Sequence, residues 1–458
     1  MASMTAILDR DWLKTALAAQ PAQRLVVAYS GGVDSHVLLH LLVRHRAHWP
    51  ERTLTAIYVD HGLQSASAAW GEHCAAVCRQ LAVPFRMLAI DARPTPGESP
   101  EAAARRARYT ALARELDSES ALLTAHHRDD QAETLLLQLL RGAGPHGLAA
   151  MPAVSRLGPG WLWRPLLGFD RAALLAYAQS HGLRWIEDSS NADPGFDRNY
   201  LRHRILPLLQ ERWPAANRTL ARAAQRCADA AEWLDQEAAA ELARAAPDRP
   251  DRLGIASLRE LPDLHQRNLV RYWLRQLQLP TPDSRQLRQL LHDVLTAGRD
   301  RQPCSRWPGV EVRRHRDGLY AMPPLTPHSA GQLLNWRATA VGWPPLTLPG
   351  IGTLRLEPTT GTGLCAGAIA EGSLLVRFRQ GGERFRPVGR LHGQELKKLL
   401  QEADIPPWER DRLPLLYAGP SLLAVVGLGI AADHAAPPGA PAWQVVLQSP
   451  SPAGSGIL

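Results

Sequence analysis

Short apolar runs alternate with amphipathic stretches along the first 215 residues. Strands are predicted by the β-branched and aliphatic runs at 24–29, 54–59, 83–90, 121–125 and near 161–164. Helices are predicted by the helical spacing of apolar residues at 36–45, 70–81, 99–116, 129–140 and 171–180. Strands that alternate with helices in this way predict an α/β fold, with a parallel sheet covered on both faces.

Beyond this first domain (1–215), long helices rich in Ala, Leu, Arg and Glu are predicted at 217–246, 264–279 and 284–296. They indicate an α-rich second domain over 216–325. The Pro-, Gly- and Thr-rich stretch 326–371 predicts a linker or an irregular β segment. A small mixed α/β domain is expected at 372–458.

The composition indicates a cytoplasmic protein with a polyanionic partner. No apolar run reaches the roughly 18 residues that span a bilayer, and the N-terminus is too polar for a signal peptide. The net charge of +8 favours nucleic acid, although coding bias toward Arg would also produce it. Five scattered cysteines indicate reduced thiols, with no disulfide and no zinc site.

The most specific motif is Ser30-Gly31-Gly32-Val33-Asp34-Ser35, between a predicted strand and a predicted helix. Glycines let the backbone approach an anion closely, and the N–H groups at a helix start favour phosphate. The Asp34 carboxylate would repel phosphate unless a cation such as Mg²⁺ lay between them. We therefore expect a nucleotide site here with Asp34 on Mg²⁺; the alternative is a plain glycine turn.

Known phosphate loops of other kinds do not fit this motif. A Walker loop would need GK[ST], and a dinucleotide fold would need GxGxxG.

A second cluster of polar residues runs from Thr124 to Thr134 (TAHHRDDQAET). Asp130 and Glu133 are three residues apart on the predicted helix and share a face. With Asp129 they need a compensating charge, such as an ammonium group or Mg²⁺. The alternative interpretation is two acids in a first helical turn and one solvated glutamate.

These motifs resemble a known family. The SGGxDS loop resembles the PP-loop of the ATP-pyrophosphatase superfamily, whose members cleave ATP between its α and β phosphates. The string TAHHxDDQxET, with VDHGL at 59–63, RRARY at 105–109, RPL at 164–166 and WIEDSSN at 185–191, resembles tRNA(Ile)-lysidine synthetase. GERFRP at 382–387, Lys397-Lys398 and IPPW at 405–408 extend the resemblance. Gln64 departs from it, because a basic residue is expected there, and any role of this position is in doubt.

The resemblance implies a ligase that acts in two steps. ATP adenylates the C2 carbonyl oxygen of the wobble cytidine in the CAU-anticodon tRNA(Ile) and releases pyrophosphate. An amine of free L-lysine then displaces AMP, which gives lysidine and changes codon reading from AUG to AUA. ATP and Mg²⁺ are the implied co-substrate and metal, and a homodimer remains an alternative to a monomer.

The resemblance also assigns residues. Ser30 to Ser35 would bind ATP, and Asp34, Asp129, Asp130 and Glu133 would be catalytic. Lysine would bind Asp130 and Glu133 together with Arg105 or Arg108, while His126 and His127 fit packing as well as acid–base work. The residues implied to contact tRNA are Arg141, Asn191, Arg198, Asn199, Arg202, Arg384, Arg386, Lys397 and Lys398.

Two other functions compete with this interpretation. A PP-loop tRNA thiolase also adenylates a base, but such enzymes usually need a cysteine pair or an iron–sulfur cluster, and no CxxC is present. A non-catalytic tRNA-binding protein would not need both the Asp34 loop and the acidic cluster.

Overall fold

A computed structural model describes residues 8–18, 20–60, 62, 67–94, 99–188, 193–246, 249–298, 301–370 and 372–448. The chain forms two compact units, one up to Glu237 and the other from Ala238 onward. The boundary falls within the long helix α10 (Ala216–Ala245). Each unit is described by itself.

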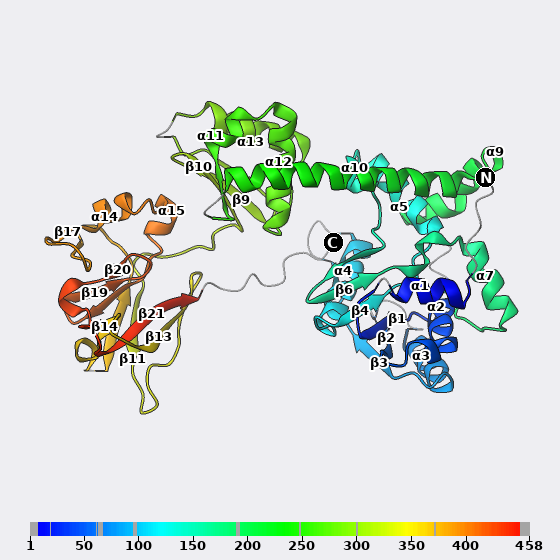
Figure 1. The fold of residues 1–458 in the computed structure, drawn as a ribbon, viewed down its shortest axis with the longest axis horizontal. Coiled ribbons are helices and arrows are strands. Elements are labelled where there is room, and N and C mark those ends of the chain that lie inside the picture. Colours follow the sequence, from blue (N-terminus) through cyan, green and yellow to red (C-terminus); the bar gives the residue numbers. More distant parts are fainter. Residues whose placement is uncertain are drawn as a thin grey trace. The chain divides into compact units, whose positions relative to one another are not determined.

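A six-stranded sheet forms the centre of the first unit, in the order β3-β2-β1-β4-β6-β5 (Figure 1). Its strands are β1 (Arg24–Ala28), β2 (Thr53–Asp60), β3 (Phe85–Ala89), β4 (Ser120–Leu123), β5 (Val154–Leu157) and β6 (Gly160–Trp163). Val26 of β1 pairs with Thr55 and Leu122, and every pairing is parallel except that of β5 with β6. The predicted α/β fold is confirmed for this unit, apart from the antiparallel edge.

Helices cover both faces of this sheet. They are α1 (Arg10–Ala18), α2 (Val33–Arg44), α3 (Ser67–Gln80), α4 (Pro100–Arg114), α5 (Arg128–Leu140) and α7 (Arg171–Ser180). Leu25 and Val27 pack with α1, α2, α3 and α7 on one face, whereas Val26 packs against α4 on the other. Successive strand residues thus point into separate cores, as expected for a strand buried on both faces.

Shorter helices follow the sheet. They are η1 (Arg46–His48), α6 (Pro145–Leu148), η2 (Pro165–Gly168), α8 (Asp197–Tyr200), the π-helical turn η4 (Leu201–Ile205) and α9 (Leu206–Arg212). The last three run on without a break in the chain. A π-helical turn is rare and is found most often at functional sites.

The second unit begins with helices and an antiparallel sheet. Its helices are α11 (Ile255–Glu260), α12 (Asp263–Gln276) and α13 (Ser284–Thr296). Its sheet, in the order β7-β10-β9-β8, contains β7 (Arg252–Gly254), β8 (Cys304–Trp307), β9 (Val310–His315) and β10 (Gly318–Met322). The predicted α-rich domain therefore needs correction, because a four-stranded sheet packs against these helices.

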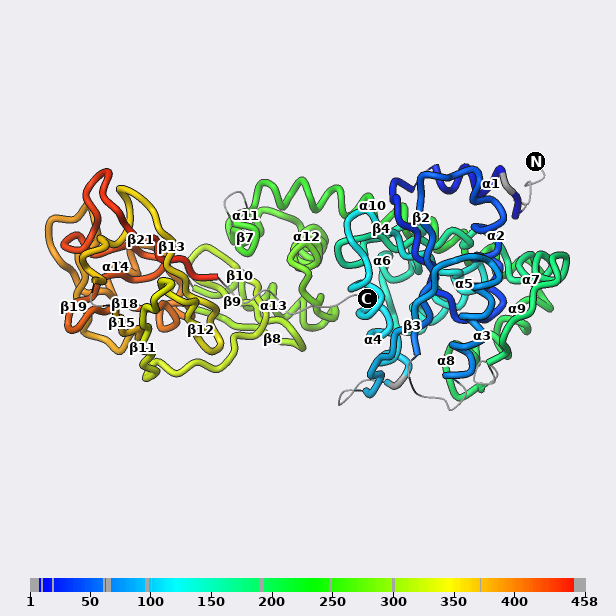
Figure 2. The backbone as a smooth tube through the Cα atoms, turned by 90° about the horizontal axis from the view of Figure 1, so that it is seen from below, coloured from blue at the N-terminus to red at the C-terminus, as the bar shows by residue number. Residues whose placement is uncertain are grey.

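Antiparallel sheets dominate the rest of the second unit. One sheet contains β11 (Leu333–Arg337), β15 (Ser373–Arg377), β18 (Leu415–Ala418), β19 (Ser421–Val425) and β20 (Gly429–Ile430), in this order. Figure 2 shows β11, β15, β18 and β19 in one region of the second unit. Another contains β12 (Leu346–Leu348), β13 (Gly352–Thr360), β21 (Pro441–Gln448) and β14 (Leu364–Cys365). The remaining elements are η5 (Ala366–Ile369), β16 (Arg384–Phe385), β17 (Gln394–Glu395), α14 (Leu396–Glu402), α15 (Pro407–Arg410) and η6 (Ala432–His434).

The stretch predicted as a linker or an irregular β segment, 326–371, contributes strands to both of these sheets. β11 pairs with β15, and β13 pairs along eight positions with β21. Its strands join the same core as the elements after residue 372. The C-terminal region is mainly antiparallel sheet with only short helices.

No helix in the described ranges combines the length and apolar character that a membrane span requires.

Candidate active site

The glycine loop lies where the sequence predicts it, at the carboxyl end of β1 and the start of α2. The Ser35 hydroxyl donates to the Gly32 carbonyl oxygen at 3.0 Å, and the Ser30 and Ser35 hydroxyl oxygens are 3.2 Å apart. Gly32 caps α2 without a side chain, so the first N–H groups of this helix are not satisfied within it. This arrangement suits an anion at the helix start.

Gly31 is required by both conformation and space. Its φ is +80°, and a Cβ there would lie 2.6 Å from the Ile186 Cδ1 atom and 3.0 Å from the Cys74 sulfur. The Ile186 N–H also donates to the Gly31 carbonyl oxygen at 2.9 Å. The loop is therefore held in shape by a segment far away in the sequence.

Asp34 faces His127, the residue that caps α5. The His127 Nε2 atom lies 3.7 Å from one Asp34 oxygen and 3.5 Å from one Asp130 oxygen. Burial alone lowers the pKa of His127, but the nearby carboxylates of Asp34 and Asp130 outweigh burial and raise it. The other Asp34 oxygen, Oδ1, is buried and has no hydrogen-bond partner among the described residues.

The Asp129 carboxylate links α5 to two other helices through hydrogen bonds. Its Oδ2 atom accepts a hydrogen bond from the Arg171 N–H at 2.9 Å, and its Oδ1 atom accepts one from the Asn217 amide at 2.5 Å. The first bond reaches the start of α7 and the second reaches the start of α10. Both carboxylate oxygens are thus engaged by the chain itself.

Asp130 and Glu133 are buried together on α5, as their spacing predicts. The Arg202 guanidinium donates to both Glu133 oxygens, at 2.6 and 2.9 Å, and to Asp130 Oδ1 at 3.0 Å. Arg198 Nε lies 3.6 Å from Glu133 Oε2. Burial raises the pKa of Glu133, and the two guanidinium groups oppose that rise. Arg202 therefore supplies the compensating charge that the acids need.

Three arginines lie near His126: Arg164 is buried, Arg105 is half-buried and Arg108 is exposed. Arg105 and Arg108 lie over the Tyr109 ring at 5.1 and 5.5 Å, and Arg164 is almost fully buried. Burial, helped by the charges of these three arginines, lowers the pKa of His126 to about 3 against the opposing effect of Asp130. Neutral His126 shares a hydrogen bond of 2.8 Å with the Thr124 hydroxyl, which fits a packing role.

The residues expected to contact tRNA occupy different environments. Arg198 and Arg202 face the acidic pair, while the buried Asn199 amide donates to the Asp193 carbonyl oxygen at 2.9 Å. Arg141 is exposed at the end of α5. Asn191 lies outside the described residues.

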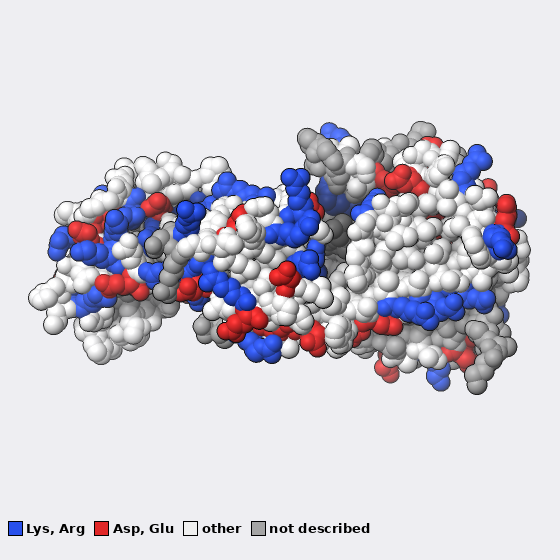
Figure 3. Space-filling model, turned by 90° about the horizontal axis from the view of Figure 1, so that it is seen from above, with Lys and Arg blue, Asp and Glu red and all other residues white. Residues whose placement is uncertain are grey.

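The basic residues of the C-terminal region are partly neutralised. Arg386 pairs with Asp433, and Arg390 pairs with Glu402 at 2.5 Å. Arg384 donates to the Gly393 carbonyl oxygen, whereas Lys397 and Lys398 are exposed on α14. Figure 3 shows basic and acidic side chains interspersed over the C-terminal part of this face.

Sequence reasoning missed how these residues are paired. It assigned Arg198 and Arg202 to RNA alone, although their four-residue spacing places both on one helix face. Asn217 and Ile186 carry no chemical signal of their own, because their roles arise from contacts with residues remote in the sequence.

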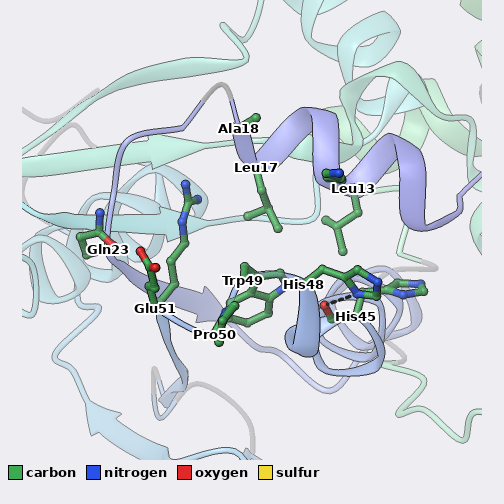
Figure 4. A pocket seen from close by; sticks show the side chains of 11 residues that line it. Leu13, Leu17, Ala18, Gln23, His45, His48, Trp49, Pro50 and Glu51 are labelled. Atoms are coloured by element: carbon green, nitrogen blue, oxygen red, sulfur yellow. Dashed lines mark hydrogen bonds between the residues drawn. The ribbon is translucent and has the colours of Figure 1, made fainter.

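A pocket of about 350 Å³ lies elsewhere, among Leu13, Leu17, Trp49, Pro50 and neighbouring residues (Figure 4). It contains Gln23 and Arg52, which directly precede β1 and β2. It therefore lies at the amino ends of these strands, whereas the glycine loop follows the carboxyl end of β1. In parallel α/β sheets ligands bind at the carboxyl ends, so we place the site at the glycine loop.

Comparison with known protein families identifies three domains along the chain. A model of the PP-loop domain matches residues 6–209. Models of the TilS substrate binding domain and of the TilS substrate C-terminal domain match residues 253–320 and 374–447. The fold and the site thus define an ATP-binding PP-loop protein with additional substrate domains.

Similar proteins extend over nearly the whole chain. The tRNA(Ile)-lysidine synthase of Coxiella burnetii is 43% identical over 93% of this chain and 93% of its own length. That of Alkalilimnicola ehrlichii is 44% identical over 95% of both. The chain belongs to the tRNA(Ile)-lysidine synthase family.

Among solved structures, a TilS C-terminal domain aligns with 27% of this chain and 100% of its own, at 25% identity and a TM-score of 0.22.

Proposed function

We propose that this protein uses ATP to join L-lysine to C2 of the wobble cytidine of the CAU-anticodon tRNA(Ile), through an adenylated tRNA intermediate. The observation that carries the proposal is the Ser30–Ser35 loop, whose Asp34 faces His127 and Asp130 beside the buried acids. Family membership over almost the full length of the chain supports the same reaction.

In the first step, the C2 carbonyl oxygen of cytidine bonds to the α-phosphorus of ATP, and the bond to pyrophosphate breaks. The loop residues Ser30, Gly31, Gly32, Val33, Asp34 and Ser35 would hold the phosphates. Donors fixed at a helix start stabilise the charge that develops on the phosphate oxygens without reorganising.

The residues present fit a magnesium ion at Asp34. Its Oδ1 atom is buried and lacks a partner among the described residues, and carboxylate oxygens are preferred ligands of this ion. Bound there with ATP, Mg²⁺ would neutralise charge on the pyrophosphate leaving group.

In the second step, a lysine nitrogen bonds to C2, the bond from C2 to the adenylated oxygen breaks, and AMP leaves. We propose that Asp130 and Glu133 accept a lysine ammonium group. Arg202 already donates to both acids, but each carboxylate oxygen can accept a second hydrogen bond. Arg105 or Arg108 would then contact the lysine carboxylate. Asp129 supports this pocket through its bonds to α7 and α10.

The tRNA would contact Arg141, Asn191, Arg198, Asn199, Arg202, Arg384, Arg386, Lys397 and Lys398. Exposure favours a direct phosphate contact for Arg141, Lys397 and Lys398. Arg198 and Arg202 would act from within the pocket, since they already bind the acids.

The decisive experiment incubates the protein with ATP, labelled lysine and a panel of tRNAs. Label should enter only the CAU-anticodon tRNA(Ile), and Asp34→Asn should abolish pyrophosphate release. Label in a tRNA with another anticodon, or none in any tRNA, would contradict the proposal. Incorporation of sulfur from a sulfur donor would identify a thiolase instead.

A further inference from the structure

Large aromatic side chains are exposed in one short segment of the first unit. Phe196, Tyr200 and Trp213 are exposed by 40%, 49% and 59%. The only other aromatic side chain this exposed among the described residues is Trp233. Aromatic rings contribute most when they are buried, so three exposed rings within eighteen residues indicate a surface that binds something.

The same helical segment reaches the active site from its other face. Phe196 directly precedes α8, and its carbonyl oxygen accepts a hydrogen bond from the Tyr200 N–H at 2.9 Å. Within the helix, Tyr200 follows Arg198 by about 200° and so faces the opposite way. Arg198 and Arg202 point inward, to Glu133. Tyr200 consequently lies on the outer side of the helix that closes over the acidic pair.

The charge of this region favours a polyanion. Between Tyr200 and Cys227 the chain has six arginines and one acid, Glu211. Arg202 is engaged with the acidic pair. The other five are exposed and form no ion pair within the described parts of the chain: Arg204, Arg212, Arg218, Arg222 and Arg226. Three of them recur every fourth residue along α10, a spacing that presents them on one side.

We propose that Phe196, Tyr200 and Trp213, together with these five arginines, form an aromatic–arginine surface that binds unpaired nucleotides of the RNA loop that carries the reactive base. The proposal rests on the proposed function. The C2 oxygen of a loop cytidine becomes accessible to ATP only when its base leaves the stack. The aromatic rings stack the neighbouring bases that lose this partner, and the arginines contact their phosphates.

Other occupants fit the surface less well. A second copy of this chain would bring the same excess of arginine and would be repelled. A purely apolar protein partner would leave five guanidinium groups without counter-charges. Unpaired RNA supplies both π-faces and phosphates.

The test compares two RNA probes by fluorescence anisotropy: a stem–loop with the CAU anticodon, and a blunt duplex of the same stem. The double variant Phe196→Ala/Tyr200→Ala should bind the stem–loop about five- to 150-fold more weakly for each base that loses its stacking partner. Duplex binding should not change. A 2-aminopurine placed in the loop should be quenched by the unaltered protein and less so by the variant.

Matched variants separate stacking from folding. Phe196→Tyr and Tyr200→Phe retain the rings and should retain stem–loop binding, and Trp233→Ala should bind like the unaltered protein. Arg222→Gln/Arg226→Gln should weaken binding of both probes and reduce the salt dependence of binding by about 0.7–0.9 for each phosphate that the variant no longer neutralises.

Two results would overturn the proposal: unchanged stem–loop binding by the alanine variant, or equal losses for both probes. The proposed function is judged separately, by lysine incorporation into tRNA with the unaltered protein. Loop-specific binding without incorporation would refute the reaction and leave the surface standing. Lysine incorporation without a loop-specific loss of binding in the variant would support the reaction and refute the proposed surface.

Discussion

Glu133 is fully buried, and both of its carboxylate oxygens accept hydrogen bonds from Arg202. A charge-assisted pair of this kind is strong only while both partners are present, because an unpaired buried charge is costly. The ionised state of Glu133 therefore stabilises both the acidic pocket and the helical segment that carries Arg202.

Glu133→Gln should raise the KM for lysine at least tenfold, while pyrophosphate release stays partly active. The neutral amide loses a charge-assisted hydrogen bond, which contributes about 1.5–3 kcal/mol. Lysine titrations of both half-reactions measure this split. The exposed Glu232→Gln is the matched control, and an unchanged lysine requirement in Glu133→Gln would remove this residue from the pocket.

His40 makes the first unit sensitive to acid. Burial lowers its pKa to about 4, helped by neighbouring His181, and its Nδ1 atom lies 2.9 Å from the Tyr177 hydroxyl. The unfolded chain binds this proton near pH 6.5, whereas the folded one resists it until about pH 4, so stability should fall as pH drops through this window. Urea midpoints at pH 7, 5.5 and 4.5 measure the loss. His40→Gln should flatten the dependence, and an equally steep one would contradict this account.

At the scale of elements, the sequence predicts those helices and strands whose signal lies in a short run of neighbouring residues. The bounds of α7 and α13 agree with the prediction, and those of α2 and α5 differ by three residues or fewer. The β7–β10 sheet was missed because its strands are short and because β9 (VEVRRH) carries charged side chains at positions that are buried in the fold. Arg314 in β9 is buried, and its guanidinium donates to the carbonyl oxygens of Val294 and Ala297. The residues next to Arg314 in the sequence do not indicate that it will bind these carbonyl oxygens.

Within the candidate site, too, the sequence predicts the residues that lie in one short motif but not the contacts between distant residues. The glycine loop and the acidic pair were predicted because each lies within one short motif. The Arg202 guanidinium that neutralises the acids comes from a different helix, and only folding reveals that contact.

Gly31→Ala should impair both the loop and the fold. A φ of +80° costs an alanine about 1–2 kcal/mol, and its Cβ would lie 2.6 Å from the Ile186 side chain. We expect a lower Tm and weaker ATP binding, measured by thermal unfolding with and without nucleotide. Gly182→Ala, where φ is also positive but a Cβ would meet no atom within 4 Å, is the control for backbone strain alone. Equal effects on ATP binding in the two variants would show that the contact with Ile186 is unimportant.

At the scale of the whole molecule, arginine rather than lysine supplies nearly all of the positive charge. The chain has only three lysines, and two of them, Lys397 and Lys398, are adjacent on α14. Both are exposed, whereas Arg386 and Arg390 are paired with acids. Free cations gain more from a phosphate than cations that must first leave a carboxylate.

Lys397→Gln/Lys398→Gln should therefore raise the KM for tRNA with little change in kcat. The slope of log K against log salt should fall by about 0.9 for each phosphate left without its lysine. Binding at several salt concentrations measures it. Arg390→Gln, whose guanidinium pairs with Glu402, should have a smaller effect, and a larger one would reverse the ranking.

The hydrogen bond from the Ile186 N–H to the Gly31 carbonyl oxygen has a consequence for biosynthesis. The nucleotide loop leaves the ribosome early, but the segment that fixes its shape is translated much later. At about 5–20 residues per second, the loop waits roughly 8 to 30 s for that partner. A nascent chain interrupted before residue 186 carries the complete phosphate motif but lacks the residue that holds the loop in its conformation.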